Sequence, residues 1–341
     1  MIILLQMFGV IIGLGFLVFI HELGHFFTAK MCKVKILIFS LGFGPDLIWH
    51  VYKGTRYSIK AIPFGGFISM AGENPDEAVG ADGEYLSLKW YKKVLISFAG
   101  PFSNYILSIF LFSFVFSIWG ASIISMSSPI GSITKNSVVV QAGLIPGDKI
   151  KSVVRLKNEF EKRTTFAIKR GKYSFDLNML VGKHLITTDR GMIDMVPLVI
   201  KMKPSSTLQS VYLGVKTSIM QTVMTVMYLV NKIVSFEKPE ISGPIGVMQL
   251  MANATKSGMQ HYLKLLAIIS VALGLFNLLP IPMVDGGMVI LFCIEGMIGK
   301  RISTKVLQVY NTIGLVFIVA IFIFATYSDF LKLGICRLFA K

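Results

Sequence analysis

Long apolar segments alternate with polar, lysine-rich connections along the chain. Four of these segments are long enough, at 1.5 Å per residue, to cross the roughly 30 Å hydrocarbon core of a bilayer. They are residues 1–29, 94–124, 265–287 and 306–327. The pattern therefore predicts a polytopic α-helical membrane protein with four transmembrane helices.

Residues 204–264 have a weaker apolar pattern. Between positions 215 and 233 apolar residues recur at helical spacing, but lysine, glutamine, serine and threonine lie among them. A helix that is apolar on one face only is typical of a segment lying in the membrane interface. We therefore expect an interfacial amphipathic helix here, followed by the segment SGPIG.

Two connections are expected to contain β-structure. Residues 30–93 include WHVYKGTRYSIKAI, in which two short strands flank a glycine turn, and this pattern predicts a β-hairpin. Residues 125–203 have strand-like runs that are broken by glycine, proline and aspartate. This second connection is predicted to be a β-rich domain outside the membrane.

The composition agrees with a membrane protein. Of the 341 residues, 54% are hydrophobic and only 15% are charged. The net charge of +16 is not accompanied by a nucleic-acid-binding motif, and the basic residues lie between apolar segments, where they would face anionic lipid. We therefore expect the lipid bilayer, and no nucleic acid, as a partner.

Basic residues also predict the orientation of the chain. Lysines are frequent in residues 30–93, and none precedes the first apolar segment. Because cytoplasmic connections carry the excess of basic residues, residues 30–93 are expected in the cytoplasm. The N-terminus and the β-rich domain are then expected outside.

The sequence HELGH lies within the first predicted helix. His21 and His25 are one helical turn apart, so both imidazoles can reach one metal ion. Glu22 lies between them and suits the general base that takes a proton from water. The alternative is a pair of hydrogen-bonded histidines at a helix end. Ionisable groups within a membrane span need a partner, which favours a metal site.

Asp285 is the best candidate for the third ligand that a catalytic zinc ion needs. It lies in NLLPIPMVDGG, where two prolines interrupt the helix and leave backbone groups that must face protein or a watery cavity. A solvated aspartate at a helix end is the alternative, and the residues alone do not decide between the two. Asp285 and the histidines each end a predicted helix. They can therefore meet only if the segment at 204–264 does not span.

Together these motifs resemble those of the site-2 proteases, a family of intramembrane zinc metalloproteases. HELGH and NLLPIPMVDGG are similar to the two metal-binding motifs of the family, and AGPFSN, SGPIG and IPFGGFISMAGE are similar to three further signatures. The closest resemblance is to the bacterial regulator-of-sigma-factor branch, which cleaves anti-sigma factors and carries a PDZ domain. It implies that His21, His25 and Asp285 bind one zinc ion per chain and that Glu22 activates water.

The resemblance also implies where substrates bind near the second motif. By its position in that motif, Asn277 is implied to hold the substrate or the oxyanion, and Pro280 and Pro282 are implied to contact the substrate. AGLIPGDKI resembles part of a PDZ domain in an abbreviated form. Peptide binding by that domain and a steric gate against bulky substrates are both open.

The hairpin in residues 30–93 is implied to be a β element that re-enters the membrane. Gly65, Gly66 and Phe67 would then contact an extended substrate peptide at its edge, by addition of a strand. An ordinary cytoplasmic hairpin is the alternative interpretation of this segment.

The implied function is proteolysis of single-span membrane proteins in the bacterial inner membrane, with anti-sigma factors or signal-peptide remnants as substrates. A catalytically inactive scaffold that binds substrates through the PDZ-like domain is the alternative, although a scaffold would be free to lose the ligand set. A metal transporter would need a polar path, and the last predicted helix has no polar residue between Thr312 and Thr326. The sequence does not predict the oligomeric state.

Overall fold

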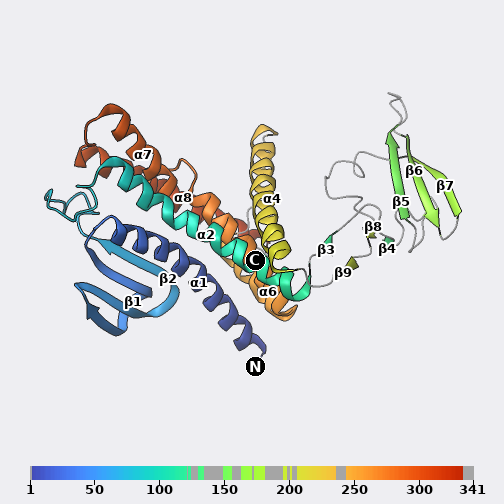
Figure 1. Cartoon of the computed structure of the whole chain (residues 1–341), viewed down its shortest axis with the longest axis horizontal. Coiled ribbons are helices and arrows are strands. Elements are labelled where there is room, and N and C mark those ends of the chain that lie inside the picture. Colours follow the sequence, from blue (N-terminus) through green and yellow to red (C-terminus); the bar gives the residue numbers. More distant parts are fainter. Residues whose placement is uncertain are drawn as a thin grey trace, which may run out of the picture. The chain divides into compact units, whose positions relative to one another are not determined.

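The structure is a computed structural model of the chain, shown in Figure 1. It describes residues 2–120, 122–123, 130–133, 149–155, 163–170, 173–180, 195–197, 200–201, 206–235 and 243–332. The chain forms two compact units. The membrane unit comprises Met1–Val115 and Thr207–Lys341, and the second unit comprises Phe116–Ser206.

Helices make up most of the described chain. They are α1 (Ile2–Met31), α2 (Trp90–Trp119), α4 (Thr207–Val234), α5 (Pro244–Lys256), α6 (Met259–Asn277), α7 (Asp285–Ile298) and α8 (Thr304–Lys332). Within the described residues, α1, α2, α4, α6 and α8 are long and apolar enough to cross a membrane. The fold is that of a polytopic membrane protein, but the predicted count of four spans is not confirmed, because α4 also qualifies.

The helices α1 and α2 lie side by side and run in opposite directions (Figure 1). His25 near the end of α1 contacts Ile96 near the start of α2, and His21 contacts Asn104 one turn earlier on α1. Helix α6 runs in the same direction as α1, because its first turn contacts Gly9 of α1 through Tyr262. The metal ligands predicted at the ends of these segments therefore lie at the same end of the bundle.

Helix α4 packs along α2 through small side chains. Gly214 lies against the main chain of α2, the hydroxyls of Ser218 and Ser108 are 3.0 Å apart, and Thr222 donates to Tyr105 at 3.3 Å. Small residues four positions apart let helices approach closely within a membrane. The first half of α4 therefore lies along a neighbouring span, and its hydroxyls face α2. This packing differs from the helix lying in the interface that was expected for residues 204–264.

Asp285 reaches the same end of the bundle as the histidines because α4 is followed by α5. Helix α4 begins near Ser113 of α2, and α5 ends near Gly9 of α1, which lies at the same end of the bundle. The chain therefore leaves this end of the bundle through α4 and returns to the same end through α5. The prediction that a crossing by α4 would separate Asp285 from the histidines did not include α5, which follows α4 and ends near Gly9.

The predicted hairpin is present and is longer than expected. It consists of β1 (Ile36–Tyr52) and β2 (Thr55–Met70), joined by a tight turn in which Lys53 and Gly54 both have positive φ. Residues 38–41 of β1 have partners both in residues 56–59 and in residues 66–69. The hairpin is therefore folded on itself, and residues 66–70 form one edge of its sheet.

The best-packed part of the membrane unit lies between α1, the hairpin, α2 and α7. Phe26, Phe39, Ile96 and Phe292 are buried there. A buried ion pair lies beside this core, with Lys93 Nζ of α2 2.6 Å from Glu295 Oε1 of α7. Removing one member of a buried pair is costly, so this contact fixes α7 on α2.

The second unit contains short strands, as predicted for a β-rich domain. Strands β5 (Lys149–Arg155), β6 (Arg163–Arg170) and β7 (Tyr173–Leu180) form an antiparallel sheet in sequence order. The remaining strands are β3 (Ser122–Ile123), β4 (Ile130–Ile133), β8 (Met195–Pro197) and β9 (Ile200–Lys201), which pair as β3 with β9 and β4 with β8. Most of AGLIPGDKI lies outside the described residues, so the PDZ assignment stays a prediction.

A disulfide cross-link tests the placement of α4. The double variant Ser108→Cys/Ser218→Cys should form a disulfide on mild oxidation, because the two hydroxyls are 3.0 Å apart. Mass spectrometry after alkylation would show the loss of two reactive thiols. Each single variant is the control, since the chain also has Cys32, Cys293 and Cys336. Two free thiols in the oxidised double variant would contradict the packing of α4 on α2.

Candidate metal centre

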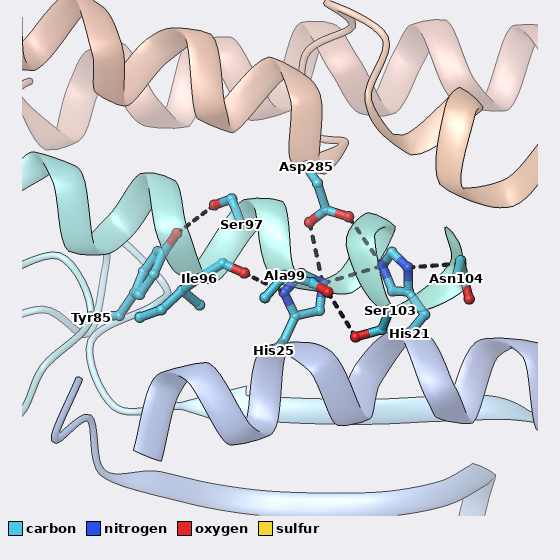
Figure 2. A network of polar contacts seen from close by, with 9 residues as sticks. All are labelled: His21, His25, Tyr85, Ile96, Ser97, Ala99, Ser103, Asn104 and Asp285. Carbon is cyan, nitrogen blue, oxygen red and sulfur yellow. Dashed lines mark hydrogen bonds and ion pairs between the residues drawn. The ribbon is translucent and has the colours of Figure 1, made fainter. Parts of the chain in front are cut away.

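Three predicted ligand residues meet in the membrane unit (Figure 2). Asp285 Oδ2 lies 3.0 Å from His21 Nε2, and Asp285 Oδ1 lies 3.4 Å from His25 Nε2. The two Nε2 atoms are 3.2 Å apart. The chain thus brings two imidazole nitrogens and one carboxylate, from helices far apart in sequence, to one point.

The spacing of these atoms fits a zinc ion. Tetrahedral zinc with bonds of about 2.0–2.1 Å has neighbouring ligand atoms about 3.3 Å apart, and catalytic sites use three protein ligands. The separations of 3.0 to 3.4 Å among the three side chains agree with that geometry. His21 and His25 are only 8% and 7% exposed, so the donor set is enclosed by protein.

Asp285 does not end the third span, as the sequence predicted, but begins a separate helix. Helix α6 ends at Asn277, and Asp285 is the first residue of α7. The N-terminus of a helix stabilises a negative charge through the helix dipole and its free N–H groups. The carboxylate is therefore held where its charge is favoured.

Residues 278–284 form the irregular connection between α6 and α7. Gly286 lies against the carbonyl of Leu278, and Gly287 lies against the carbonyl of Ile281, so a side chain at either position would collide with the backbone. Helix α8 covers the connection at Pro282, where Gly314 makes close contact. Helices α7 and α8 thus cover part of the irregular backbone, while Pro280 and Met283 are exposed. Irregular backbone at membrane depth has to face protein or a watery cavity.

Helix α2 supports both histidines along one face. His25 Nδ1 donates to the carbonyl of Ile96 at 2.8 Å, and the amide of Asn104 lies 3.2 Å from His21 Nδ1. Gly100 lies between these two positions, and a Cβ there would collide with both imidazoles. Residues 96, 100 and 104 recur every four positions, so they share one side of the helix.

The individual roles of Gly100 and Asn104 were not predicted from the sequence. Both residues lie in AGPFSN, which resembles a family signature, but the resemblance did not assign a function to either residue. Two signals were available. An amide within a membrane span needs a hydrogen-bonding partner, and the four-residue spacing of Asn104 and Gly100 places both on one helix face.

Glu22 lies on the side of α1 that faces the hairpin. A Cβ at Gly66 would be 3.1 Å from Glu22 Cγ, so β2 passes directly beside this side chain. Gly65 precedes this contact and has a φ of 93°, and it lies against Val18 of α1. Phe67 follows it and is 40% exposed. The edge of the sheet is therefore adjacent to the predicted base.

Asn277 is the last residue of α6, and Pro280 and Pro282 lie in the connection before Asp285. Asn277 is half-buried and Pro280 is exposed. The part of the chain that the structure describes contains no hydrogen-bonding partner for the Asn277 side chain. Its contact with substrate stays a prediction.

Comparison with known proteins agrees with this site. Residues 9–321 match the model of Peptidase family M50. A protein of Clostridium acetobutylicum named "Putative zinc metalloprotease" is 31% identical, with 94% of this chain and 95% of the relative covered. An Agrobacterium fabrum protein with the same description is 29% identical, with 94% of each covered. "Probable protease eep" of Enterococcus faecalis is 25% identical, with 94% of this chain and 97% of the relative covered.

The fold and the site define a multi-pass membrane protein with a metal centre between its helices. The chain belongs to Peptidase family M50, the site-2 proteases. It is a zinc metalloendopeptidase of that type.

Substitution of Gly100 tests the shape of the centre. Gly100→Ala should lower the zinc affinity about tenfold or more, because the added Cβ displaces both imidazoles. Zinc content of the purified protein measures this effect. Alanine favours helix, so circular dichroism should show the same helix content in the metal-free variant as in the wild type. Full zinc occupancy in the variant would contradict the proposed position of the metal.

Proposed function

We propose that this protein is an intramembrane endopeptidase that hydrolyses single-span transmembrane substrates at a zinc ion held by His21, His25 and Asp285. The observation that carries the proposal is the convergence of these three side chains at separations of 3.0 to 3.4 Å. Among the described residues they are the one group of three metal-ligating side chains within reach of a common ion. This supports one zinc ion per chain.

Each residue has a defined task in peptide hydrolysis. His21, His25 and Asp285 would hold the zinc ion, which would supply Lewis-acid activation of a water molecule and of the scissile carbonyl. Glu22 accepts a proton from the attacking water and delivers it to the leaving amine nitrogen. Asn277 is proposed to hold the substrate or the developing oxyanion from the side of the connection before Asp285.

The substrate must be extended at the scissile bond, since a helix hides its carbonyl groups. Residues 66–70 form an edge of the hairpin sheet, and among the described strands they pair with β1 alone. This edge passes beside Glu22 at Gly66. We therefore propose that an unwound stretch of substrate pairs with this edge, with contacts to Gly65, Gly66 and Phe67.

The position of the hairpin supports a β element that re-enters the membrane. The carbonyl of Pro63 in β2 lies close to Gly15, near the middle of the long apolar helix α1. Residues 47–52 of β1 are exposed, and five of them are large apolar or aromatic residues: Leu47, Ile48, Trp49, Val51 and Tyr52. Exposed apolar side chains raise the free energy of the protein in water but not in lipid, so this surface favours contact with lipid.

We place the protein in the bacterial inner membrane with the zinc site near the cytoplasmic side. The lysines between α1 and α2 support this orientation, which puts the N-terminus and the second unit outside. The bacterial relatives are named as proteases. Anti-sigma factors and signal-peptide remnants are the proposed substrates, in regulated intramembrane proteolysis.

The variant Glu22→Gln tests the proposed function directly. It should keep its zinc but cleave a model single-span substrate about 10²–10⁴ times more slowly, because the amide cannot accept the proton. Cleavage is measured in vesicles, and zinc content is measured on the same sample. The exposed Glu77 provides a matched control, so Glu77→Gln should cleave at the wild-type rate. Wild-type cleavage by Glu22→Gln would contradict the mechanism and favour a different base.

A further inference from the structure

Asn104 is a fully buried amide next to a predicted ligand. Its Nδ2 lies 3.2 Å from His21 Nδ1, while its Oδ1 is buried and has no hydrogen-bonding partner within the described residues. Its main-chain oxygen accepts a hydrogen bond from Ser270 of α6 at 2.7 Å. The backbone at Asn104 is therefore held in place, and its side chain faces His21.

The two histidines are supported by different kinds of group. His25 Nδ1 lies 2.8 Å from the carbonyl of Ile96, which can only accept, so the proton is on Nδ1 and Nε2 is free to bind a metal. His21 Nδ1 faces an amide, which has a donor on one side and an acceptor on the other. The support of His21 is thus compatible with both neutral tautomers.

In one arrangement His21 is hydrogen-bonded through both ring nitrogens without a metal. Asn104 Nδ2 donates to His21 Nδ1, and the proton on His21 Nε2 is donated to Asp285 Oδ2 at 3.0 Å. This neutral tautomer of His21 has no lone pair on Nε2 and cannot bind zinc through that atom. The hydrogen bond to Asp285 therefore holds His21 in a tautomer that is not ready for metal.

In the other arrangement the side-chain amide of Asn104 is flipped by about 180°, which exchanges Oδ1 and Nδ2. Oδ1 of Asn104 then accepts a proton from Nδ1 of His21, and Nε2 presents a lone pair beside Asp285. Hydrogen bonds of this kind fix the tautomer and the ring orientation of metal-binding histidines. Only the side-chain torsion of Asn104 has to change, because Ser270 holds its main chain.

We infer that Asn104 is the positioning residue that sets the tautomer of His21, and that its amide turns over when zinc binds. This inference rests on the proposed role of His21 as a ligand. It predicts how zinc affinity depends on the side chain at position 104. Aspartate can only accept a hydrogen bond from His21 Nδ1, so it favours the tautomer that binds zinc. Asparagine can stabilise both tautomers, and leucine can stabilise neither.

Zinc affinity tests this order. Competition with a chromophoric chelator should show zinc binding about 10- to 100-fold weaker for Asn104→Leu than for wild type. Asn104→Asp should bind zinc at least as tightly as wild type. Ser108→Ala is the matched control, because it loses a buried hydrogen bond of the same helix without touching a ligand, and its affinity should be unchanged.

Two results would overturn the inference: wild-type affinity in Asn104→Leu, or an affinity of Asn104→Asp as low as that of Asn104→Leu. A wild-type protein that binds no zinc would instead contradict the proposed function. The unmodified protein offers a second test that does not depend on the folding of variants. Nitrogen-15 NMR of labelled histidine should show His21 Nδ1 without a proton in the zinc-free protein and with one in the zinc-loaded protein. The same tautomer in both states would refute the inference.

Discussion

The contact of Asp285 with His21 and His25 is the interaction on which the arrangement of the membrane unit depends. A carboxylate and two imidazoles inside a membrane protein are costly unless they meet each other or a metal. Meeting requires that the first residue of α7 reaches the last third of α1. The buried pair of Lys93 and Glu295 fixes the far end of α7 on α2. Helix α2 also contacts both histidines of α1.

The other elements follow from that requirement. Helices α4 and α5 return the chain to the end at which α6 must start, so that α6 runs in the same direction as α1. The connection before Asp285 is irregular, and α7 and α8 cover part of it. The hairpin places its edge beside Glu22 and leaves the opposite side of the histidines to α2. The centre therefore has one side formed by helices and one side formed by the edge strand of the hairpin.

Much of this could be predicted from the sequence because the signals are local. One helical turn between His21 and His25 places both on one face, and the broken helix before Asp285 marks buried backbone. The packing of α4 could not be predicted in the same way. Its polar residues were interpreted as the sign of a helix in the membrane interface, whereas Ser218 and Thr222 contact hydroxyls of α2. Only the tertiary contact distinguishes these two cases. The start of α7 at Asp285 and the support from Asn104 likewise depend on contacts between distant segments.

X-ray absorption at the zinc edge of the purified protein tests whether His21, His25 and Asp285 bind the metal. We expect a four-coordinate zinc ion with two imidazole nitrogens and oxygen ligands at about 2.0–2.1 Å, and loss of an oxygen ligand's contribution in Asp285→Ala. Sulfur ligands at about 2.3 Å would contradict it, since they would place zinc at cysteine instead. A spectrum of Asp285→Ala identical to that of the wild type would also contradict it, because the carboxylate would then not bind the metal.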